Sequence, residues 1–173
     1  MITRYYQPTD AAKQVRVQQA FQQRSLLFEA FFRANFEQVP PDAVQAAVGM
    51  LQTGDWLLAQ ESLMYAPHGG RNSTPVFYCI APDPQTLDTM CATIFKTSVK
   101  VKLLVREGSA EQEAAQIAGF RKVGVFESEA LLGGQLMNMV ALERFHPEWG
   151  APAGEDLEVL PTSEDANVSR VWE

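Results

Sequence analysis

The apolar stretch VFYCIA, residues 76–81, constrains the fold of this chain more than any other feature. A strand without alternating polar positions is suited to burial on both faces, so helices are expected on both sides of it. Asp83-Pro84 then opens a helical segment that runs to about Thr97. Residues 99–106 (VKVKLLVR) alternate as a strand with one solvent-exposed face, which would account for their lysines. The pattern predicts an α/β (α+β) domain.

Periodicity and breaker residues predict the other elements. Gly119 is expected to end a helix in the left-handed conformation, after which Phe120 packs back on the sheet as the chain turns into a strand. Gly, Asn, Ser and Pro mark residues 66–75 as a loop. The expected strands are 2–7, 55–62, 121–127 and 135–143, and the expected helices are 11–36, 41–52 and 110–118.

The helical pattern over residues 11–36 is rich in phenylalanine. Apolar residues recur there at three- and four-residue steps, with basic residues between them, which favours a core face with a solvated back. The density of rings also suggests that some of them, with Phe28 and Phe32 as the candidates, face a protein partner or a second copy of the chain.

Composition sets further bounds. The chain has 173 residues, 46% of them hydrophobic and 20% charged, as in an ordinary globular domain. No apolar run is long enough to cross a bilayer, and the N-terminus does not resemble a signal peptide, so a cytoplasmic setting is expected. Cys79 and Cys91 are expected to be reduced, buried thiols rather than metal ligands.

The charge is concentrated at the C-terminus. Residues 146–173 contain seven acids and one base, whereas the remaining body has 14 acids and 13 bases. A nearly neutral body lacks the basic surface that direct nucleic-acid binding requires. We therefore expect a domain over residues 1–145 and an extended acidic tail over 146–173. Two apolar clusters of the tail are candidate docking segments, with Leu157, Leu160 and Trp172 as their main residues.

Three stretches resemble the N-acetyltransferase (GNAT) superfamily. ITRYYQPTD is similar to its first strand and the start of its first helix. VREGSAEQEAAQIAGFRKVGVFE resembles its fifth strand, fourth helix, closing Gly-Phe and sixth strand, and QLMNMVALER resembles its seventh strand. The resemblance covers about residues 1–145 and implies a mixed, mostly antiparallel central sheet flanked by helices. The family's third strand would lie in 63–66 or be missing.

The resemblance also identifies where acetyl-CoA would bind. In the family a loop similar to Arg/Gln-x-x-Gly-x-Gly/Ala, at a helix N-terminus, holds the pyrophosphate of acetyl-CoA through backbone N–H groups. In IAPDPQTLDTMCATIF the two glycine positions fall on Asp88 and Met90, where a carboxylate and a bulky side chain oppose binding. The candidate cofactor-binding residues are Ile80, Gln85, Leu87, Asp88, Thr89, Met90 and Cys91.

The catalytic positions of the family are equally altered. The cofactor-binding asparagine falls on Gly108, or on Ser109 with a one-residue gap, and the tyrosine that protonates the leaving thiolate falls on Ala115. Alanine has no proton to donate. Tyr65 or Tyr78 would have to replace it, and Glu61 is the candidate base.

These observations lead to three hypotheses. The first is a non-catalytic GNAT-fold protein, for which no cofactor is expected, that acts as a structural or interaction component of a larger assembly. It resembles small GNAT-like proteins of tailed phages, which implies a virion or ejection component assembled in the cytoplasm. The second is a divergent acetyl-CoA-dependent N-acetyltransferase. The third is a regulatory domain that binds another small ligand in the former cofactor cleft.

Overall fold

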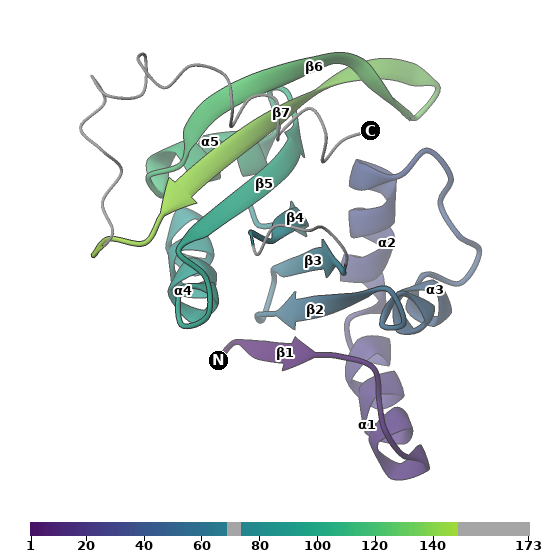
Figure 1. Ribbon diagram of the computed structural model, residues 1–173. Helices are drawn as coiled ribbons and strands as arrows, with labels where there is room; N and C mark the ends of the chain where they lie inside the picture. The colour runs from purple at the N-terminus through teal and green to yellow at the C-terminus, as the bar shows by residue number, and fades with distance from the viewer. Residues whose placement is uncertain (69–73, 149–173) are drawn as a thin grey trace.

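The computed structural model describes residues 1–68 and 74–148. Seven strands form one sheet in the order β1-β2-β3-β4-β5-β7-β6 (Figure 1). All neighbouring strands are antiparallel except β4 and β5, which are parallel. This is the mixed, mostly antiparallel sheet that was predicted. The strands are β1 (Thr3–Tyr5), β2 (Gly54–Leu58), β3 (Leu63–Pro67), β4 (Val76–Ile80), β5 (Lys100–Arg106), β6 (Arg121–Leu132) and β7 (Gln135–Phe145).

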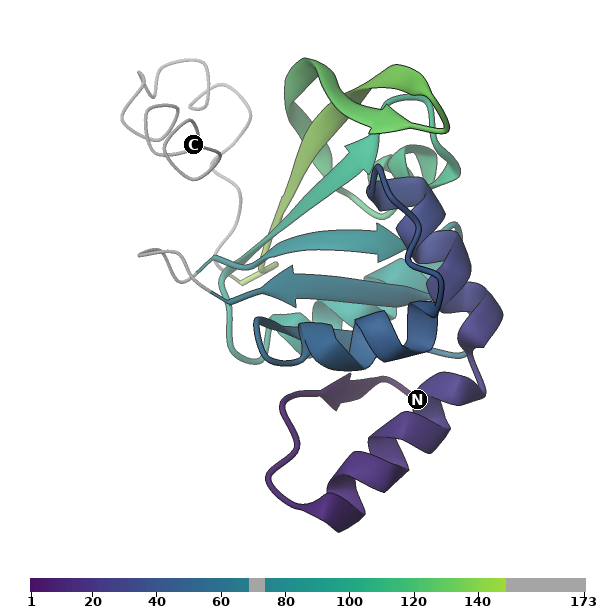
Figure 2. The ribbon, with the colours of Figure 1, turned by 90° about the vertical axis from the view of Figure 1, so that its right-hand side faces the viewer.

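Five helices cover the two faces of this sheet (Figure 2). On β4, Phe77 and Cys79 face one apolar core, while Tyr78 and Ile80 face the other. The first core lies under α4 and α5, and the second under α1, α2 and α3. None of these helices is long and apolar enough to span a membrane. The helices are α1 (Ala11–Gln22), α2 (Ser25–Asn35), α3 (Ala43–Met50), α4 (Pro84–Ile94) and α5 (Ala110–Ile117).

The predicted helix over residues 11–36 is two helices. Arg24 leaves the helical conformation, with φ −121° and ψ 27°, and its side chain donates a hydrogen bond to the Ala59 carbonyl. The break allows Phe21 of α1 and Phe28 of α2 to pack against the same ring, that of Trp56 in β2. Periodicity alone could not detect it, because the apolar spacing continues across the break.

Phe28 and Phe32 lie in the core. Their residues are 0% and 4% exposed, and Phe28 stacks edge-on against Trp56 at 5.0 Å between ring centroids. The prediction that these two rings face a partner is therefore wrong, because burial against the sheet leaves neither of them a surface to offer. The tail residues Leu157, Leu160 and Trp172 lie outside the described residues.

The burial of the β5 side chains and the lengths of β6 and β7 differ from the prediction. Lys100 and Glu143 are 9% and 6% exposed, so at Lys100 the predicted wet face of β5 is instead a buried ion pair, while Arg106 is exposed as predicted. Strands β6 and β7 extend further than expected and join through Gly133 and Gly134, both at positive φ, as a two-residue hairpin turn requires. The sequence left open whether the family's third strand is present, and β3 is that strand.

The C-terminus of α5 has the predicted geometry. Gly119 has φ +92°, and the Phe120 N–H donates to the Ala115 carbonyl at 2.9 Å. This bond and the one from the Gly119 N–H to Gln116 satisfy carbonyls that the helix end would leave unpaired. Phe120 is 4% exposed and packs in the core under α4 and α5.

Gly119→Ala should lower the free energy of unfolding by roughly 1–2 kcal/mol, because alanine is strained in the left-handed region. The control is Gly49→Ala in α3, where an added Cβ meets nothing within 4 Å. That change should be neutral or stabilise by up to about 1 kcal/mol. Urea unfolding of both variants tests the prediction, and equal effects would contradict it.

Phe28→Ala should cost about 3–5 kcal/mol of folding free energy, since it leaves a cavity beside Trp56. Leu26→Ala, two residues earlier on the same helix but 77% exposed, should change stability by less than about 0.5 kcal/mol. Thermal and urea unfolding would measure both. A Phe28→Ala variant as stable as wild type, but altered in its oligomeric state, would restore the interface prediction.

Candidate functional site

The strands β4 and β5 diverge at the centre of the sheet. They pair only at Val76–Lys102 and Phe77–Leu103, although both strands continue for three more residues. Between the diverging ends lies a cavity of about 20 Å³. That volume holds about one water molecule. The cavity is lined by Ala34, Asn35, Cys79, Val105, Arg106, Ser109 and Glu111.

A side chain from α2 closes this gap. The Asn35 Nδ2 donates to the Cys79 carbonyl at 3.2 Å and to the Phe31 carbonyl at 3.0 Å. The Cys79 carbonyl is a main-chain acceptor of β4 at the point where β5 no longer pairs with it. Asn35 therefore uses a group that a ligand lying between the strands would otherwise engage.

The N-terminus of α4 is occupied by the chain's own carboxylate. Asp83 accepts hydrogen bonds from the Thr86 N–H at 2.9 Å and the Thr86 hydroxyl at 2.5 Å. The hydroxyl bond, followed by bonds from the Thr86 and Gln85 N–H groups, lowers the pKa of Asp83 below its ordinary value. Asp83 is thus an anion at neutral pH, placed where a helix N-terminus would attract a phosphate.

The connection from β4 to α4 also lacks donors. It consists of residues 81–83, and two of the four residues from Ala81 to Pro84 are prolines without an N–H group. Once Asp83 has bound the N–H group of Thr86, the first turn of α4 has few N–H groups left for a ligand.

Most of the predicted cofactor-binding residues lie inside α4 rather than in a loop. The Leu87 N–H donates to the Asp83 carbonyl at 3.0 Å, and residues 88–91 follow within the helix. The acetyltransferase hypothesis requires the amides of residues 87–91 to be accessible to a ligand, whereas in the structure these residues lie within a helix that starts at Pro84. Leu87, Met90 and Cys91 are 0% exposed and pack in the core. Met90 thus points inward and obstructs nothing.

The remaining candidates of this segment lie apart from the cavity. Asp88 is exposed and lies 2.6 Å from the Arg144 Nη1 as an ion pair, and the Thr89 hydroxyl donates to the Gln85 carbonyl. Gln85 is exposed at the first turn of α4, and Ile80 is half-buried at the end of β4, toward α2. None of these residues lines the cavity.

The catalytic candidates are not brought together. Glu61 is exposed in the turn between β2 and β3, outside either strand. The Tyr65 hydroxyl donates to the Met50 carbonyl at 2.9 Å and is 3.0 Å from the Thr53 hydroxyl, so it holds α3 to the sheet. Tyr78 is half-buried against Phe36, and burial followed by the charge of Glu129 raises its pKa. Neither tyrosine is among the residues that line the cavity.

The family's other positions have structural roles here. Ala115 is fully buried in the core. The Gly108 N–H donates to Gln112 Oε1 at 2.7 Å, and the Ser109 hydroxyl accepts from the Gln112 N–H at 3.2 Å as the N-cap of α5. A side chain at position 109 that caps a helix is already engaged.

The cysteines behave as predicted. Both are free and buried, and burial raises the pKa of the Cys79 thiol well above its usual range and that of Cys91 to about 12. Within residues 1–68 and 74–148, no group of three or more His, Cys, Asp or Glu side chains could hold a metal ion.

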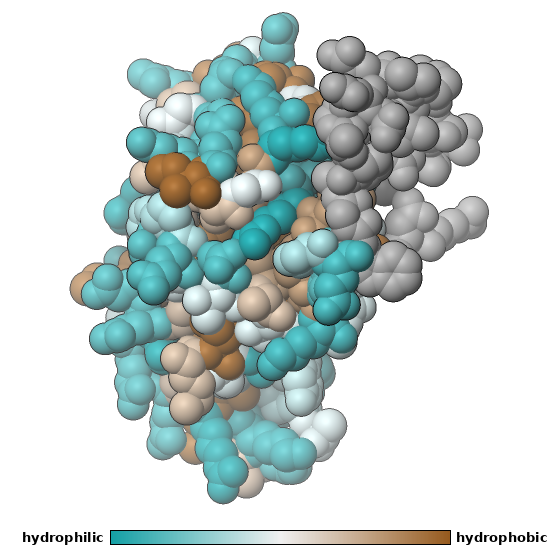
Figure 3. All heavy atoms as spheres, turned by 90° about the vertical axis from the view of Figure 1, so that its left-hand side faces the viewer, coloured by the Kyte–Doolittle hydropathy of each residue, from teal (hydrophilic) through white to brown (hydrophobic). Residues whose placement is uncertain are grey.

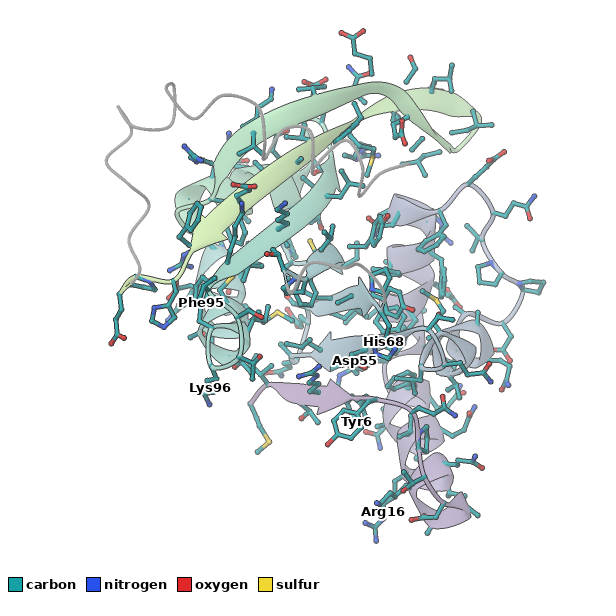
Figure 4. All side chains as sticks on the ribbon, viewed as in Figure 1. Tyr6, Arg16, Asp55, His68, Phe95 and Lys96 are labelled. Carbon is teal, nitrogen blue, oxygen red and sulfur yellow. The ribbon has the colours of Figure 1, made fainter. Side chains whose placement is uncertain are left out.

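Sequence reasoning missed an ion cluster that lies between β1, β2 and the residue after β3. Asp55 is 6% exposed and accepts from Arg4 Nε at 3.0 Å, while His68 Nε2 lies 2.7 Å from its other oxygen (Figure 4). In the described part of the chain, the His68 ring has no other side-chain hydrogen bond. The cluster ties β1 to β2 and to the residue after β3.

The described residues on the side of the molecule shown in Figure 3 form no large apolar patch. The described part of that side is mostly hydrophilic, with scattered apolar groups. Isolated exposed apolar residues, such as Leu26 and Ile117, are common on globular proteins.

Known proteins resemble this chain in structure and not in sequence. No protein-family model matches the chain, and no curated protein does. An acetyltransferase from Salmonella typhimurium, which modifies the N-terminal serine of ribosomal protein L7/L12, superposes with a TM-score of 0.58 at 13% identity. The match covers 84% of this chain and 95% of that one.

Two further structures agree. The ribosomal-protein-S5-alanine acetyltransferase from Vibrio fischeri gives a TM-score of 0.56 at 9% identity and covers 87% of this chain and 94% of that one. The spermidine N-acetyltransferase from Vibrio cholerae, solved with CoA and spermine, gives 0.55 at 13% identity and covers 83% and 95%. From β1 to β7, this chain has the fold of the GNAT N-acetyltransferases.

Proposed function

We propose that this chain is a non-catalytic GNAT-fold protein that serves as a structural or interaction component of a larger assembly. The observation that carries the proposal is the N-terminus of α4, where Asp83 takes the amides that would hold a pyrophosphate. Pro82 and Pro84 remove two further donors from the same segment. The residues present do not fit acetyl-CoA at this point.

Electrostatics favour the same conclusion. A pyrophosphate placed at this helix end would meet the ionised carboxylate of Asp83 at close range. Like charges in contact repel, and here the hydrogen bonds from Thr86 hold the carboxylate in place and keep it ionised. A site built for phosphate needs the opposite arrangement, with unpaired N–H groups and no acid.

The gap between β4 and β5 is also too small for the arm of a cofactor. A volume of about 20 Å³ accommodates a water molecule, whereas ligand pockets are typically on the order of 300–1,000 Å³. Asn35 spans the gap to the main chain of β4. The same volume argues against the third hypothesis, a regulatory ligand bound in this position.

The second candidate function is a divergent acetyl-CoA-dependent N-acetyltransferase, and the structural neighbours favour it. All three compared structures are acetyltransferases, and one was solved with CoA. The diverging parallel pair β4–β5 is present in this chain. For this candidate, Asn35 would have to leave the Cys79 carbonyl, and Tyr78 would remain the candidate acid.

The identity of the assembly is a separate matter. A virion or ejection component, a cytoplasmic setting and protein partners remain predictions from the resemblance to phage proteins and from the tail. No contact among the described residues supports a particular partner.

Acetyl-CoA at about 1 mM should produce no heat of binding and no rise in Tm. A ligand present at a hundredfold excess over its Kd stabilises a protein by about 2.7 kcal/mol, so thermal unfolding is a sensitive test. Micromolar binding by calorimetry would overturn the proposal in favour of the acetyltransferase, and the search would turn to an amine substrate.

The variant Asp83→Asn distinguishes the effect of the Asp83 charge on acetyl-CoA binding from the effect of the N–H donors that the two prolines remove. Asparagine caps a helix about as well as aspartate but carries no charge. Since both prolines remain, this variant should also fail to bind. The matched control is Asp42→Asn, which changes the N-cap of α3, where the carboxylate accepts from the Gln45 N–H in the same way. Binding by the Asp83→Asn variant alone would show that charge was the only obstacle.

A further inference from the structure

The first half of α1 projects from the body of the molecule. Every residue from 11 to 16 is exposed, and the first buried residue of the helix is Val17. Figures 1 and 2 both show α1 extending past β1, at the opposite end of the molecule from the β6–β7 hairpin. Short helices gain most of their stability from packing, which this half of α1 does not receive from the described part of the chain. We call residues 6–16 the α1 arm.

The α1 arm presents basic and apolar side chains to solvent. Tyr6 and Val15 are 63% and 55% exposed, and the Lys13 side chain is 61% exposed. Lys13 Nζ lies 3.8 Å from a carboxylate oxygen of Asp10, whereas no carboxylate among the described residues pairs with Arg16. Figure 4 shows Tyr6 just after β1 and Arg16 on α1. The arm is therefore an exposed surface with an unpaired base.

The end of the β6–β7 hairpin projects in a similar way. β5 ends at Arg106, which pairs with Met139, so residues 127–138 of the hairpin continue beyond the last pair with β5. Leu131 and Leu136 lie directly opposite each other in this part and are 36% and 65% exposed. We call residues 127–138 the hairpin tip, and it offers an apolar pair to solvent.

The hairpin tip carries the charge opposite to that of the α1 arm. Glu127 and Glu129 are exposed and pair with no base among the described residues. The tip has these two acids and no base, whereas the arm has two bases and one acid. Opposite charges make the two surfaces complementary. Two arms in contact would oppose their bases, and two tips would oppose their acids, so charge disfavours a symmetric contact.

The arm and the tip are too far apart to meet within one molecule. β1 and β6 are the two edge strands of the sheet, with five strands between them. At about 4.8 Å between neighbouring strands, these edges lie roughly 29 Å apart. The arm extends further away from β1 (Figure 1). Complementary surfaces at opposite ends of one chain fit a second copy of that chain.

We propose that the α1 arm of one copy of this chain docks on the hairpin tip of a second copy. The bases of the arm then face the acids of the tip, while Val15 packs against Leu131 and Leu136. Because each copy keeps one free arm and one free tip, the contact repeats head to tail and builds a ring or a filament. The inference rests on the proposed role as an interaction component, and it names a second copy of the chain as the partner.

Sedimentation velocity of the full-length chain tests the contact. At low salt, the average mass should rise with protein concentration. The association constant should fall severalfold near 1 M salt, where charges are screened within about 3 Å. A chain that stays monomeric at every concentration in low salt would overturn the inference.

The substitution Arg16→Glu should weaken self-association by about tenfold or more, because it places a like charge against the tip. Lys96→Glu is the matched control, since it makes the same change in net charge. Lys96 is exposed just after α4 and belongs to neither surface (Figure 4), so its substitution should leave the association unchanged. Equal effects of the two substitutions would show that net charge alone acts, which contradicts a specific contact.

An exchange of charges between two copies identifies both surfaces. The tip variant Glu127→Arg/Glu129→Arg should associate as weakly by itself as the Arg16→Glu variant. A mixture of the two variants should regain the association, because the reversed arm of one meets the reversed tip of the other, and their unchanged surfaces also match. Thermal unfolding would establish that both variants are folded. A mixture of folded variants that remains monomeric rejects the contact.

Carbodiimide cross-linking, which joins a lysine amine directly to a carboxylate, identifies what covers the arm. In a mixture of isotopically light and heavy protein, Lys13 should link to Glu127 or Glu129 of a different molecule. Links from Lys13 to acids of residues 149–173 in the same molecule would instead identify the chain's own C-terminal segment as the occupant, and the inference would be wrong.

Failure of this inference and failure of the proposed function have different readouts. A monomeric chain that binds no acetyl-CoA would overturn only the inference, and the interaction role would then require a different protein as the partner. Micromolar binding of acetyl-CoA would overturn the proposed function whether or not the chain self-associates.

Discussion

Two parallel residue pairs between β4 and β5 join the halves of this molecule. Among the described residues, the strands β1–β4 pair with the strands β5–β7 only at Val76–Lys102 and Phe77–Leu103. The core under α4 and α5 reinforces this junction, since Phe77, Leu103 and Leu142 all contribute to it. Because the strands diverge immediately beyond these pairs, the same junction creates the small cavity between β4 and β5.

What fills that gap determines the function that can be proposed. In this chain Asn35 approaches from α2, and the Pro82-Asp83-Pro84 segment closes the adjacent helix end. Each feature is an ordinary stabilising device, a side-chain hydrogen bond in one case and a helix cap in the other. In the function proposed above, these two features occupy groups that acetyl-CoA would need. A chain can therefore have the fold of an acetyltransferase without the residues of its cofactor site, since fold and function are generally separable.

The other unusual feature is the charged face behind the same strands. In a strand, alternation of Lys100, Lys102 and Arg106 with apolar residues normally indicates contact with water. Here Glu143 of β7 draws two of these lysines into a buried cluster with Arg121.

The sequence by itself determined the local features. Gly119 and Phe120 predicted a helix end and a return to the sheet, and Asp83-Pro84 predicted a helix start, because these signals depend on backbone conformations of a few neighbouring residues. Burial of the cysteines also followed from residue type alone.

Only the tertiary structure decided the rest. The break at Arg24 depends on Ala59 and Trp56, the role of Asn35 depends on Cys79, and the burial of Lys100 depends on Glu143. Each partner lies more than thirty residues away in the sequence, and periodicity carries no information about such contacts. The family's cofactor loop aligns with residues 87–91, but for a related reason these residues lie inside a helix. A helix starts where its first N–H groups find a cap, and Asp83 provided that cap four residues earlier.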